Sequence, residues 1–261
     1  MTKTPDIAFF QRLAAVSAAA SLPHFRAHGA VENKLTDGFD PVTAADRAVE
    51  SALREVISEH YPDHGILGEE FDLKEGDGVH QWVLDPIDGT RAFISGLPVW
   101  GVLAGLNRND RSIAGMMYQP FTDELFCADE DGSWYVRGDT EPLPLQTRTA
   151  KSLADATLFT TSPHLFEGAA RDRFSKLEAA VKLFRYGCDC YAFAMLAAGH
   201  ADIVVEPGLQ PYDICGLISL IEKAGGVVTD WDGGRPEAGG NVVAAATAEL
   251  HDKTLALLNP K

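Results

Sequence analysis

The feature that most constrains the fold is the stretch at residues 81–93, which reads QWVLDPIDGTRAF. Its apolar run at residues 82–84 is short and rich in β-forming residues, so it predicts a buried strand. The chain then turns polar at Asp85 and Asp88, and the proline between them biases Asp85 away from helical torsion angles. Two carboxylates are therefore expected to converge at the end of a strand. The alternative is a strand followed by an ordinary Asp/Gly turn.

Gly89 and Thr90 come next and predict the start of a helix. The first backbone N–H groups of a helix have no partner within it, so they favour an anion at that end. Carboxylates on one side and an anion on the other would then share one small volume. Such an arrangement requires a cation between the negative groups.

The whole chain predicts two lobes, residues 1–146 and 147–261. In the first lobe, amphipathic helices at 6–26 and 43–60 are separated by a polar loop at 34–40, and a short strand at 65–68 follows. The second helix is expected to begin at Thr43 as its N-cap. Alternating segments at 99–106, 113–119, 124–128 and 133–137 then predict an antiparallel meander.

The second lobe predicts an α/β architecture, because helices and strands alternate from Gln146 onward. The expected helices span 168–180, 189–198, 211–224 and 248–258. The expected strands span 158–161, 182–186, 201–206, 227–230 and 242–246.

Three further acids are expected at the ends of elements, where functional groups are usually presented. Glu69 follows the strand at 65–68, while Asp46 and Asp213 each lie in the first turn of a predicted helix. Helix capping and the helix dipole are alternative explanations for Asp46 and Asp213. Unpaired carboxylates about 4 Å apart repel by roughly 4 kcal/mol per pair at an effective dielectric constant of about 20. Asp46, Glu69, Asp85, Asp88 and Asp213 together therefore need cations, and ligation by oxygen alone suits Mg²⁺.

The net charge of −16 over 261 residues argues against a nucleic-acid partner and against an anionic membrane surface. It does not exclude a small anionic substrate, because bound cations would set the local field. Four cysteines without a C-x-x-C pair suit reduced thiols, and no run resembles a signal peptide or a membrane span, so the cytoplasm is the expected location. A zinc site at Cys188 and Cys190 is an alternative. The pairs His24/His28 and His60/His64 are expected to be exposed at helix ends.

The sequence resembles the inositol monophosphatase-like, lithium-sensitive phosphatases over about residues 34 to 234. The matching motifs are TAAD at 43–46, GEE at 68–70, WVLDPIDGT at 82–90, Glu206, and the Asp213 segment leading into EKAGG at 222–226. Where the family has Trp-Asp, this chain has Tyr212-Asp213, which keeps the carboxylate. Within the family, TRAFISGLPVWG at 90–101 and Tyr212-Asp213 look most like the histidinol-phosphate phosphatase branch.

This resemblance implies a layered α/β/α/β/α fold, two to three Mg²⁺ ions per active site and a homodimer. It implies that Glu69, Asp85 and the Ile87 carbonyl bind the first ion, that Asp85, Asp88 and Asp213 bind the second, and that Asp46 with Glu69 binds a weaker third. Glu69 and Thr90 would orient the attacking water, with Asp85 as the remaining catalytic residue. The substrate would contact Asp88, Gly89, Thr90, Arg185, Asp189, Glu206 and Asp213.

Asp189 and Glu206 favour one substrate within this family. Inositol-type members commonly have a small residue where this chain has Asp189. An added carboxylate suits a substrate that carries a cation, and L-histidinol phosphate has an ammonium group and an imidazole. The expected reaction is therefore the hydrolysis of L-histidinol phosphate, a step of histidine biosynthesis.

Other readings remain open at this point. The substrate could be inositol monophosphate, another small sugar phosphate or a nucleotide 3′-phosphate, and Asp189 could serve only as a helix cap. A reading from another class is a non-catalytic binding or regulatory protein on the same fold.

Overall fold

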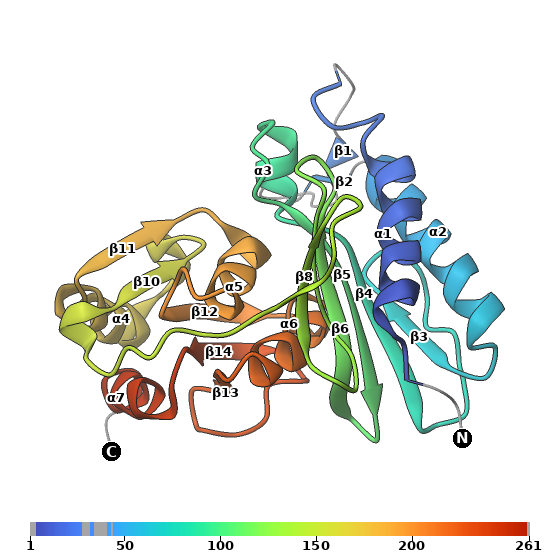
Figure 1. The fold of residues 1–261 in the computed structure, drawn as a ribbon. Coiled ribbons are helices and arrows are strands. Elements are labelled where there is room, and N and C mark those ends of the chain that lie inside the picture. The colour runs from blue at the N-terminus through green and yellow to red at the C-terminus, as the bar shows by residue number, and fades with distance from the viewer. Residues whose placement is uncertain (1–3, 28–31, 34–40, 43, 260–261) are drawn as a thin grey trace.

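Two large β-sheets and three layers of helices stack in the order helices, sheet, helices, sheet, helices (Figure 1). The computed structural model describes residues 4–27, 32–33, 41–42 and 44–259. The layered α/β/α/β/α fold expected from the sequence is confirmed. The loop expected at residues 34–40 and the N-cap expected at Thr43 lie outside the described residues. No helix in the described ranges is both long enough and apolar enough to span a bilayer.

The first sheet contains the predicted meander. Its strands, in spatial order, are β3 (Gly65–Gly68), β4 (His80–Asp88), β5 (Gly101–Arg108), β6 (Arg111–Gln119), β7 (Glu124–Ala128), β8 (Ser133–Arg137) and β9 (Leu143–Pro144). Only β3 and β4 run parallel, and every other neighbouring pair in this sheet is antiparallel. The ends of β3 and β4 therefore lie at the same edge of the sheet.

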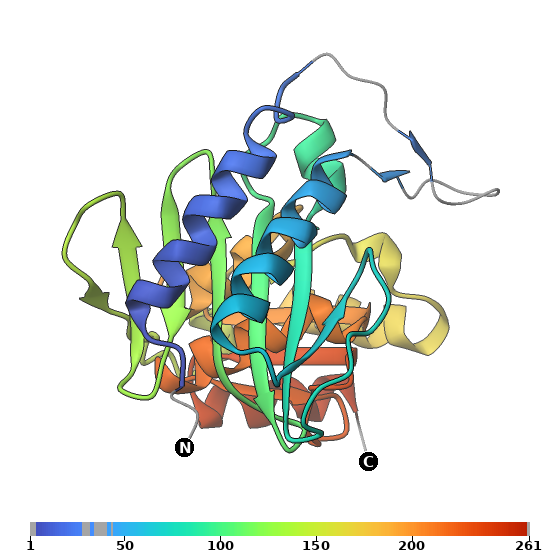
Figure 2. The same cartoon turned by 90° about the vertical axis from the view of Figure 1, so that its right-hand side faces the viewer.

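Two long helices, α1 (Ile7–Ser21) and α2 (Ala44–His60), cover one face of this sheet (Figure 2). Asp6 caps α1 by accepting a hydrogen bond from the Phe9 N–H at 3.0 Å, and apolar side chains of both helices pack around Trp82. The expectation that α1 continues to residue 26 is wrong. Because Pro23 lacks an N–H and its ring clashes with the preceding turn, the helix ends at Ser21.

The second sheet has the order β11 (Leu183–Tyr186), β10 (Thr157–Thr160), β12 (Ile203–Leu209), β14 (Gly240–Ala245) and β13 (Val227–Asp230). β10 is parallel to both of its neighbours, and the pairs that involve β14 are antiparallel. The outer face is covered by α4 (Gly168–Ala180) and α7 (Ala248–Leu258), which bury Phe174 and Leu250 against it.

The layer between the sheets is formed by α5 (Asp189–Ala197) and α6 (Pro211–Lys223). Leu103 and Phe126 of the first sheet belong to the same buried cluster as Ile218 of α6. The approach is close, since a Cβ added at Gly115 would lie 2.4 Å from the carbonyl oxygen of Gly216. The two predicted lobes consequently share a core.

Several short elements complete the chain: β1 (Glu32–Asn33), β2 (Pro41–Val42), α3 (Thr90–Ile94) and the 3₁₀ turns η1 (Leu153–Asp155) and η2 (Pro163–Leu165). Among the strands, the sequence did not predict β1, β2 or β9. It also placed the end of β4 at Asp85, whereas β4 continues to Asp88, and β12 continues beyond Glu206 to Leu209. Both extensions contain a register shift, which lets a strand continue past residues that interrupt its regular ladder.

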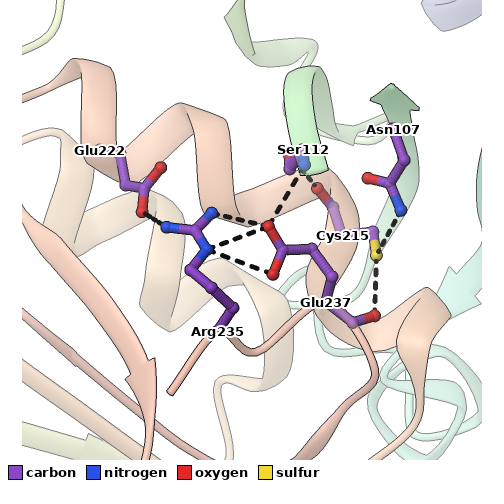
Figure 3. A network of polar contacts seen from close by, with 6 residues as sticks. All are labelled: Asn107, Ser112, Cys215, Glu222, Arg235 and Glu237. Carbon is purple, nitrogen blue, oxygen red and sulfur yellow. Dashed lines mark hydrogen bonds and ion pairs between the residues drawn. The ribbon is translucent and has the colours of Figure 1, made fainter. Parts of the chain in front are cut away.

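A polar network connects α6 to the β5–β6 hairpin and to the β13–β14 loop (Figure 3). Arg235 binds Glu222 on α6 and also binds Glu237, with 2.7 Å between Arg235 Nη2 and Glu237 Oε1. The Ser112 N–H donates to the same Glu237 oxygen at 3.3 Å, and the Cys215 thiol donates to the Glu237 carbonyl at 3.3 Å. Every carboxylate in this network is thus matched by a donor or a cation.

Candidate active site

Asp85 and Asp88 converge because β4 contains a bulge between them. In a regular strand, residues three apart point to opposite faces of the sheet. Here Asp85 pairs with Leu103 and Asp88 pairs with Gly101, so three steps along β4 match only two steps along β5. The extra residue in the bulge turns the side chains of Asp85 and Asp88 to the same face of the sheet. Pro86 lies within the bulge, where its missing N–H costs no hydrogen bond between the strands.

Asp213 meets this pair from the first turn of α6. Its Oδ2 accepts a hydrogen bond from the Gln210 N–H at 2.7 Å, so the residue does help to cap the helix. Asp85, Asp88 and Asp213 also each place one carboxylate oxygen within 4.8 Å of the other two. Capping and participation in the acidic group are therefore compatible roles for Asp213.

Glu69 and Asp46 complete the acidic group around Asp85. Glu69 directly follows β3, which runs parallel to β4, and Asp46 is buried in the first turn of α2. Burial raises the pKa of Asp85 well above its usual range, and the charges of Glu69, Asp88, Asp213 and Asp46 raise that pKa further. The structure thus brings together all five acids that the sequence singled out.

Gly89 and Thr90 form the turn from β4 into α3. Gly89 has φ 82° and ψ 40°, a left-handed conformation that favours glycine. A Cβ at this position would also lie 3.0 Å from Oδ2 of Asp189, so the carboxylate of Asp189 sits directly beside the turn. The Thr90 hydroxyl donates to the Ile87 carbonyl oxygen at 3.2 Å. That oxygen retains a second lone pair with which it can bind a metal ion.

The first turn of α5 lies beside the same acids. The Cys190 N–H donates to Asp88 Oδ2 at 2.6 Å, which directly links the first turn of α5 to the end of β4. Asp189, with φ 43°, accepts a hydrogen bond from the Thr161 hydroxyl at 3.4 Å. Burial raises the pKa of Asp189, although the Thr161 hydrogen bond and the nearby charge of Arg91 oppose that rise.

Glu206 is buried in β12 beside this turn. Its carboxylate accepts hydrogen bonds from the Thr161 N–H at 2.5 Å and from the Thr160 hydroxyl at 3.3 Å. Burial raises the pKa of Glu206 to about 8 despite these hydrogen bonds.

Arg185 lies in the exposed edge strand β11. Its charge partly offsets the burial that raises the pKa of the Cys188 thiol.

The donor set fits a divalent cation that prefers oxygen ligands. Burial raises the pKa of Asp88 well above its usual range, and the charges of Asp189 and Asp213 add to this effect. Ionising several such groups at neutral pH is costly unless a cation joins them. The carboxylates of Asp85, Asp88 and Asp213, the Ile87 carbonyl and the nearby Glu69 offer the all-oxygen environment that Mg²⁺ requires.

Some contacts at this site were not found from the sequence. The Cys190 N–H is a backbone group and leaves no signature in the residue pattern. Thr160 and Thr161, which hold Glu206, could have been noticed as consecutive hydroxyl residues directly after an apolar strand. Glu50, a fully buried acid of α2, could have been noticed because it falls within the helix's apolar stripe.

A second group with possible metal ligands, His64, Asp77 and His80, lies at the other end of β4. His64 was expected to be exposed, and this is wrong, because it is buried with its ring stacked between Tyr61 and His80. The Trp82 indole donates to His64 Nδ1 at 3.2 Å, so the proton of the neutral ring is on Nε2. Neither ring nitrogen of His64 then has a lone pair available for a metal. The companion expectation for His28 concerns a residue outside the described ranges.

Comparisons with known proteins agree on one family. The model of the inositol monophosphatase family matches residues 3–260. The chloroplastic bifunctional phosphatase IMPL2 of Arabidopsis thaliana is 41% identical over 230 residues, which are 84% of this chain and 65% of that protein's length. A histidinol-phosphatase of Chlorobaculum parvum is 33% identical, over 88% of this chain and 87% of that protein. Among solved structures, an inositol monophosphatase from Zymomonas mobilis superposes with a TM-score of 0.84 at 36% identity, covering 97% of each chain.

Proposed function

Because this chain belongs to the inositol monophosphatase family of metal-dependent phosphatases, we propose that it hydrolyses L-histidinol phosphate to L-histidinol and inorganic phosphate. The observation that carries the choice of substrate is the pair of carboxylates, Asp189 and Glu206, beside the acidic group. The histidinol-phosphatase relative supports the same choice. The chain spans only 65% of the Arabidopsis phosphatase, so nothing about that larger protein is carried over.

The acids of the first lobe and Asp213 are proposed to hold Mg²⁺. Asp85, Asp88 and Asp213 converge from β4 and α6, while Glu69 and Asp46 approach Asp85 from a second side. When bound, Mg²⁺ lowers the pKa of a coordinated water and neutralises charge on the phosphate. Asp85, Asp88 and Asp213 must be ionised to bind it, so the raised pKa values of these three acids make metal affinity depend on pH.

Two further roles are the orientation of the attacking water and the binding of the phosphate. We assign Glu69 and Thr90 to the orientation of the attacking water, since Thr90 is anchored to the Ile87 carbonyl beside Asp88. The phosphate would lie against the turn at Gly89, where the absence of a side chain leaves the backbone accessible. The alcohol part of the substrate would then extend toward Asp189.

Asp189 and Glu206 are proposed to bind the cationic groups of the substrate. An ammonium group would give each carboxylate a charge-assisted hydrogen bond and would favour their ionised forms. A neutral polyol can form hydrogen bonds with carboxylates but does not offset their charge. Arg185 is exposed at the edge of the sheet, so we place it at the rim of the site.

The test compares two phosphate esters in the wild-type enzyme and in Asp189→Asn. Asparagine caps a helix as well as aspartate does and tolerates positive φ, so this change removes the charge and retains the local fold. We expect kcat/KM for histidinol phosphate to fall at least about tenfold, or ~1.4 kcal/mol, while kcat/KM for inositol 1-phosphate changes little. Asp172→Ala, an exposed acid on α4, controls for the loss of one negative charge.

Equal losses on both esters would mean that Asp189 serves the fold and not substrate selection. A wild-type enzyme that prefers inositol 1-phosphate would replace the proposed substrate with an inositol monophosphate, the class of substrate in the name of the Zymomonas relative.

A further inference from the structure

Glu50 is a fully buried charged residue that the proposed reaction does not use. It lies on α2, one helical turn after Asp46, and its relative exposure is 0%. Its Oε2 accepts a hydrogen bond from the Glu70 N–H at 2.7 Å. Its Oε1 accepts one from Arg54 Nε at 2.8 Å, on the same helix. Glu50 therefore connects α2 to the backbone of the segment that contains Glu69.

Arg54 holds the next residue of that segment. Its Nη2 donates to the Phe71 carbonyl oxygen at 3.0 Å, and its guanidinium lies 5.8 Å from the centre of the Phe71 ring. The N–H of residue 70 and the carbonyl of residue 71 are thus both bonded to one ion pair on α2. This fixes the path of the chain immediately after Glu69.

The backbone immediately before Glu69 is held in place at Gly68. A Cβ at this position would lie 2.0 Å from Glu50 Oε1, so the carboxylate occupies the space that any side chain there would need. The Glu50 carboxylate thus lies against the residue before Glu69, Gly68, and is hydrogen-bonded to the residue after it, Glu70. α2 also carries Asp46, so one rigid helix sets the positions of both acids.

Stability alone does not account for an ion pair in this place. Replacing a buried ion pair by apolar residues of similar volume is often neutral or stabilising. Groups that orient metal ligands, in contrast, typically change metal affinity 10–100-fold when they are altered.

We propose that Glu50, together with Arg54, is a positioning residue that sets Glu69 relative to Asp46 for metal binding. This inference rests on the proposed function, because it takes Glu69 and Asp46 as metal ligands. Glu50 does not touch the metal or the substrate in this assignment. Its effect reaches the site only through the backbone at residues 68–71.

The test is a calorimetric titration of Mg²⁺ into the wild-type protein, Glu50→Gln and Glu55→Gln, at a temperature where all three are folded. Glutamine keeps the size of Glu50, but its NH₂ group cannot accept a hydrogen bond, so only one of the Glu70 and Arg54 contacts survives. We expect the Kd of at least one Mg²⁺ site to rise about tenfold or more in Glu50→Gln. Glu55 is an exposed acid of the same helix, and its substitution should leave binding unchanged.

Steady-state kinetics provide a second readout. Glu50→Gln should need about tenfold more Mg²⁺ for half-maximal rate, yet it should approach wild-type kcat and KM at saturating Mg²⁺. A merely structural role would lower the melting temperature without moving the Mg²⁺ midpoint.

Gly68→Ala tests the same contact if Glu50→Gln folds poorly. Its methyl group should displace the Glu50 carboxylate and weaken Mg²⁺ binding to a similar extent. In a Glu50→Ala background the methyl group has room, so the same substitution should then cause less than about a twofold further loss.

Wild-type Mg²⁺ affinity in Glu50→Gln, or equal weakening in Glu55→Gln, would overturn this inference and leave the proposed function standing. A wild-type protein that neither binds Mg²⁺ nor hydrolyses phosphate esters would instead overturn the proposed function.

Discussion

The two ends of α6 hold their acids in different surroundings. At the C-terminal end, Arg235 forms ion pairs with Glu222 and with the neighbouring Glu237. At the N-terminal end, Asp213 lies close to Asp85 and Asp88. Burial favours the protonated form at both ends. At the C-terminal end the hydrogen bonds from Arg235 outweigh burial, and the pKa of Glu237 is lowered. At the N-terminal end the neighbouring groups include other carboxylates, and the pKa of Asp85 is raised well above its usual range.

The two groups of acids differ in whether the protein itself supplies a compensating cation. Around Glu237, the protein supplies its own cation and a set of donors, so the network is complete without a ligand. Around Asp85, hydrogen bonds such as the one from the Cys190 N–H to Asp88 orient the carboxylates but do not neutralise them. Acids in that condition lower their free energy most when an external cation binds.

The largest expected effect comes from removing one acid at the N-terminal end. Asp88→Asn should reduce kcat/KM by about 10³-fold or more, equivalent to ~4 kcal/mol, because a proposed metal ligand loses its charge. The melting temperature of the metal-free variant should not fall, since the asparagine carbonyl can still accept a hydrogen bond from the Cys190 N–H and a neutral amide carries no cost of ionisation in this buried place. Enzyme kinetics and thermal melts in chelator measure the two results.

The matched control for this prediction is Glu222→Gln at the other end of the helix, which should keep wild-type activity. An Asp88→Asn enzyme that retains more than about a tenth of wild-type kcat/KM would contradict the assignment of Asp88 as a ligand.

The reverse pattern is expected when the cation at the C-terminal end is removed. Arg235→Ala should lower the free energy of unfolding by about 1–3 kcal/mol, because Glu237, whose side chain is only 8% exposed, loses its charged partner. Activity and Mg²⁺ affinity should stay unchanged at temperatures where the variant is folded. Urea unfolding and steady-state kinetics separate the two effects.

Adding Glu237→Gln to Arg235→Ala should recover part of the loss, since the unpaired charge is then absent. Lost Mg²⁺ affinity in a folded Arg235→Ala protein would mean that the two ends are not independent.

A smaller effect should appear in the pH dependence of the metal-free protein. Burial raises the pKa of Asp85 and Asp88 well above their usual range and that of Glu206 to about 8. At pH 7 Glu206 therefore still binds a proton in the folded protein, whereas carboxyl groups in the unfolded chain titrate near pH 4. Stability should therefore fall as pH rises from about 7 to 8, by up to ~1.4 kcal/mol per pH unit for each group that remains protonated.

Thermal melts at these pH values, with and without Mg²⁺, measure this slope. The chosen window lies above the titration of His64, whose pKa is lowered by burial and which would contribute the opposite slope at lower pH. Mg²⁺ should flatten the slope, because it binds the ionised carboxylates. A melting temperature in chelator that rises across this window would contradict the raised pKa values.

Much of the fold could be predicted from the sequence because local signals agree with tertiary packing. The ranges of α4 and α7 match the expected helices at 168–180 and 248–258, and Thr247 caps α7 by accepting from the Leu250 N–H. The five acids of the site could be found because each lies beside a strand end or a helix start.

The bulge in β4 could not be predicted in the same way, because it exists only through pairing with β5. From the sequence alone, Pro86 indicates the end of a strand. The two-residue strand β9 has exposed side chains and is too short to show any periodicity. The contacts of Glu50 with Gly68 and Glu70 join segments far apart in the sequence, so no local pattern contains them.

The position of α5 and α6 between the sheets has a consequence for how the chain emerges from the ribosome. Leu103, Met117 and Phe126 belong to the first sheet but share a buried cluster with residues of α5 and α6. These strands are synthesised well before the helices that cover them. During that interval the nascent chain exposes an apolar sheet face of the kind that chaperones bind and that favours aggregation. Asp213 arrives with α6, so the step that buries this face is also the step that completes the acidic group.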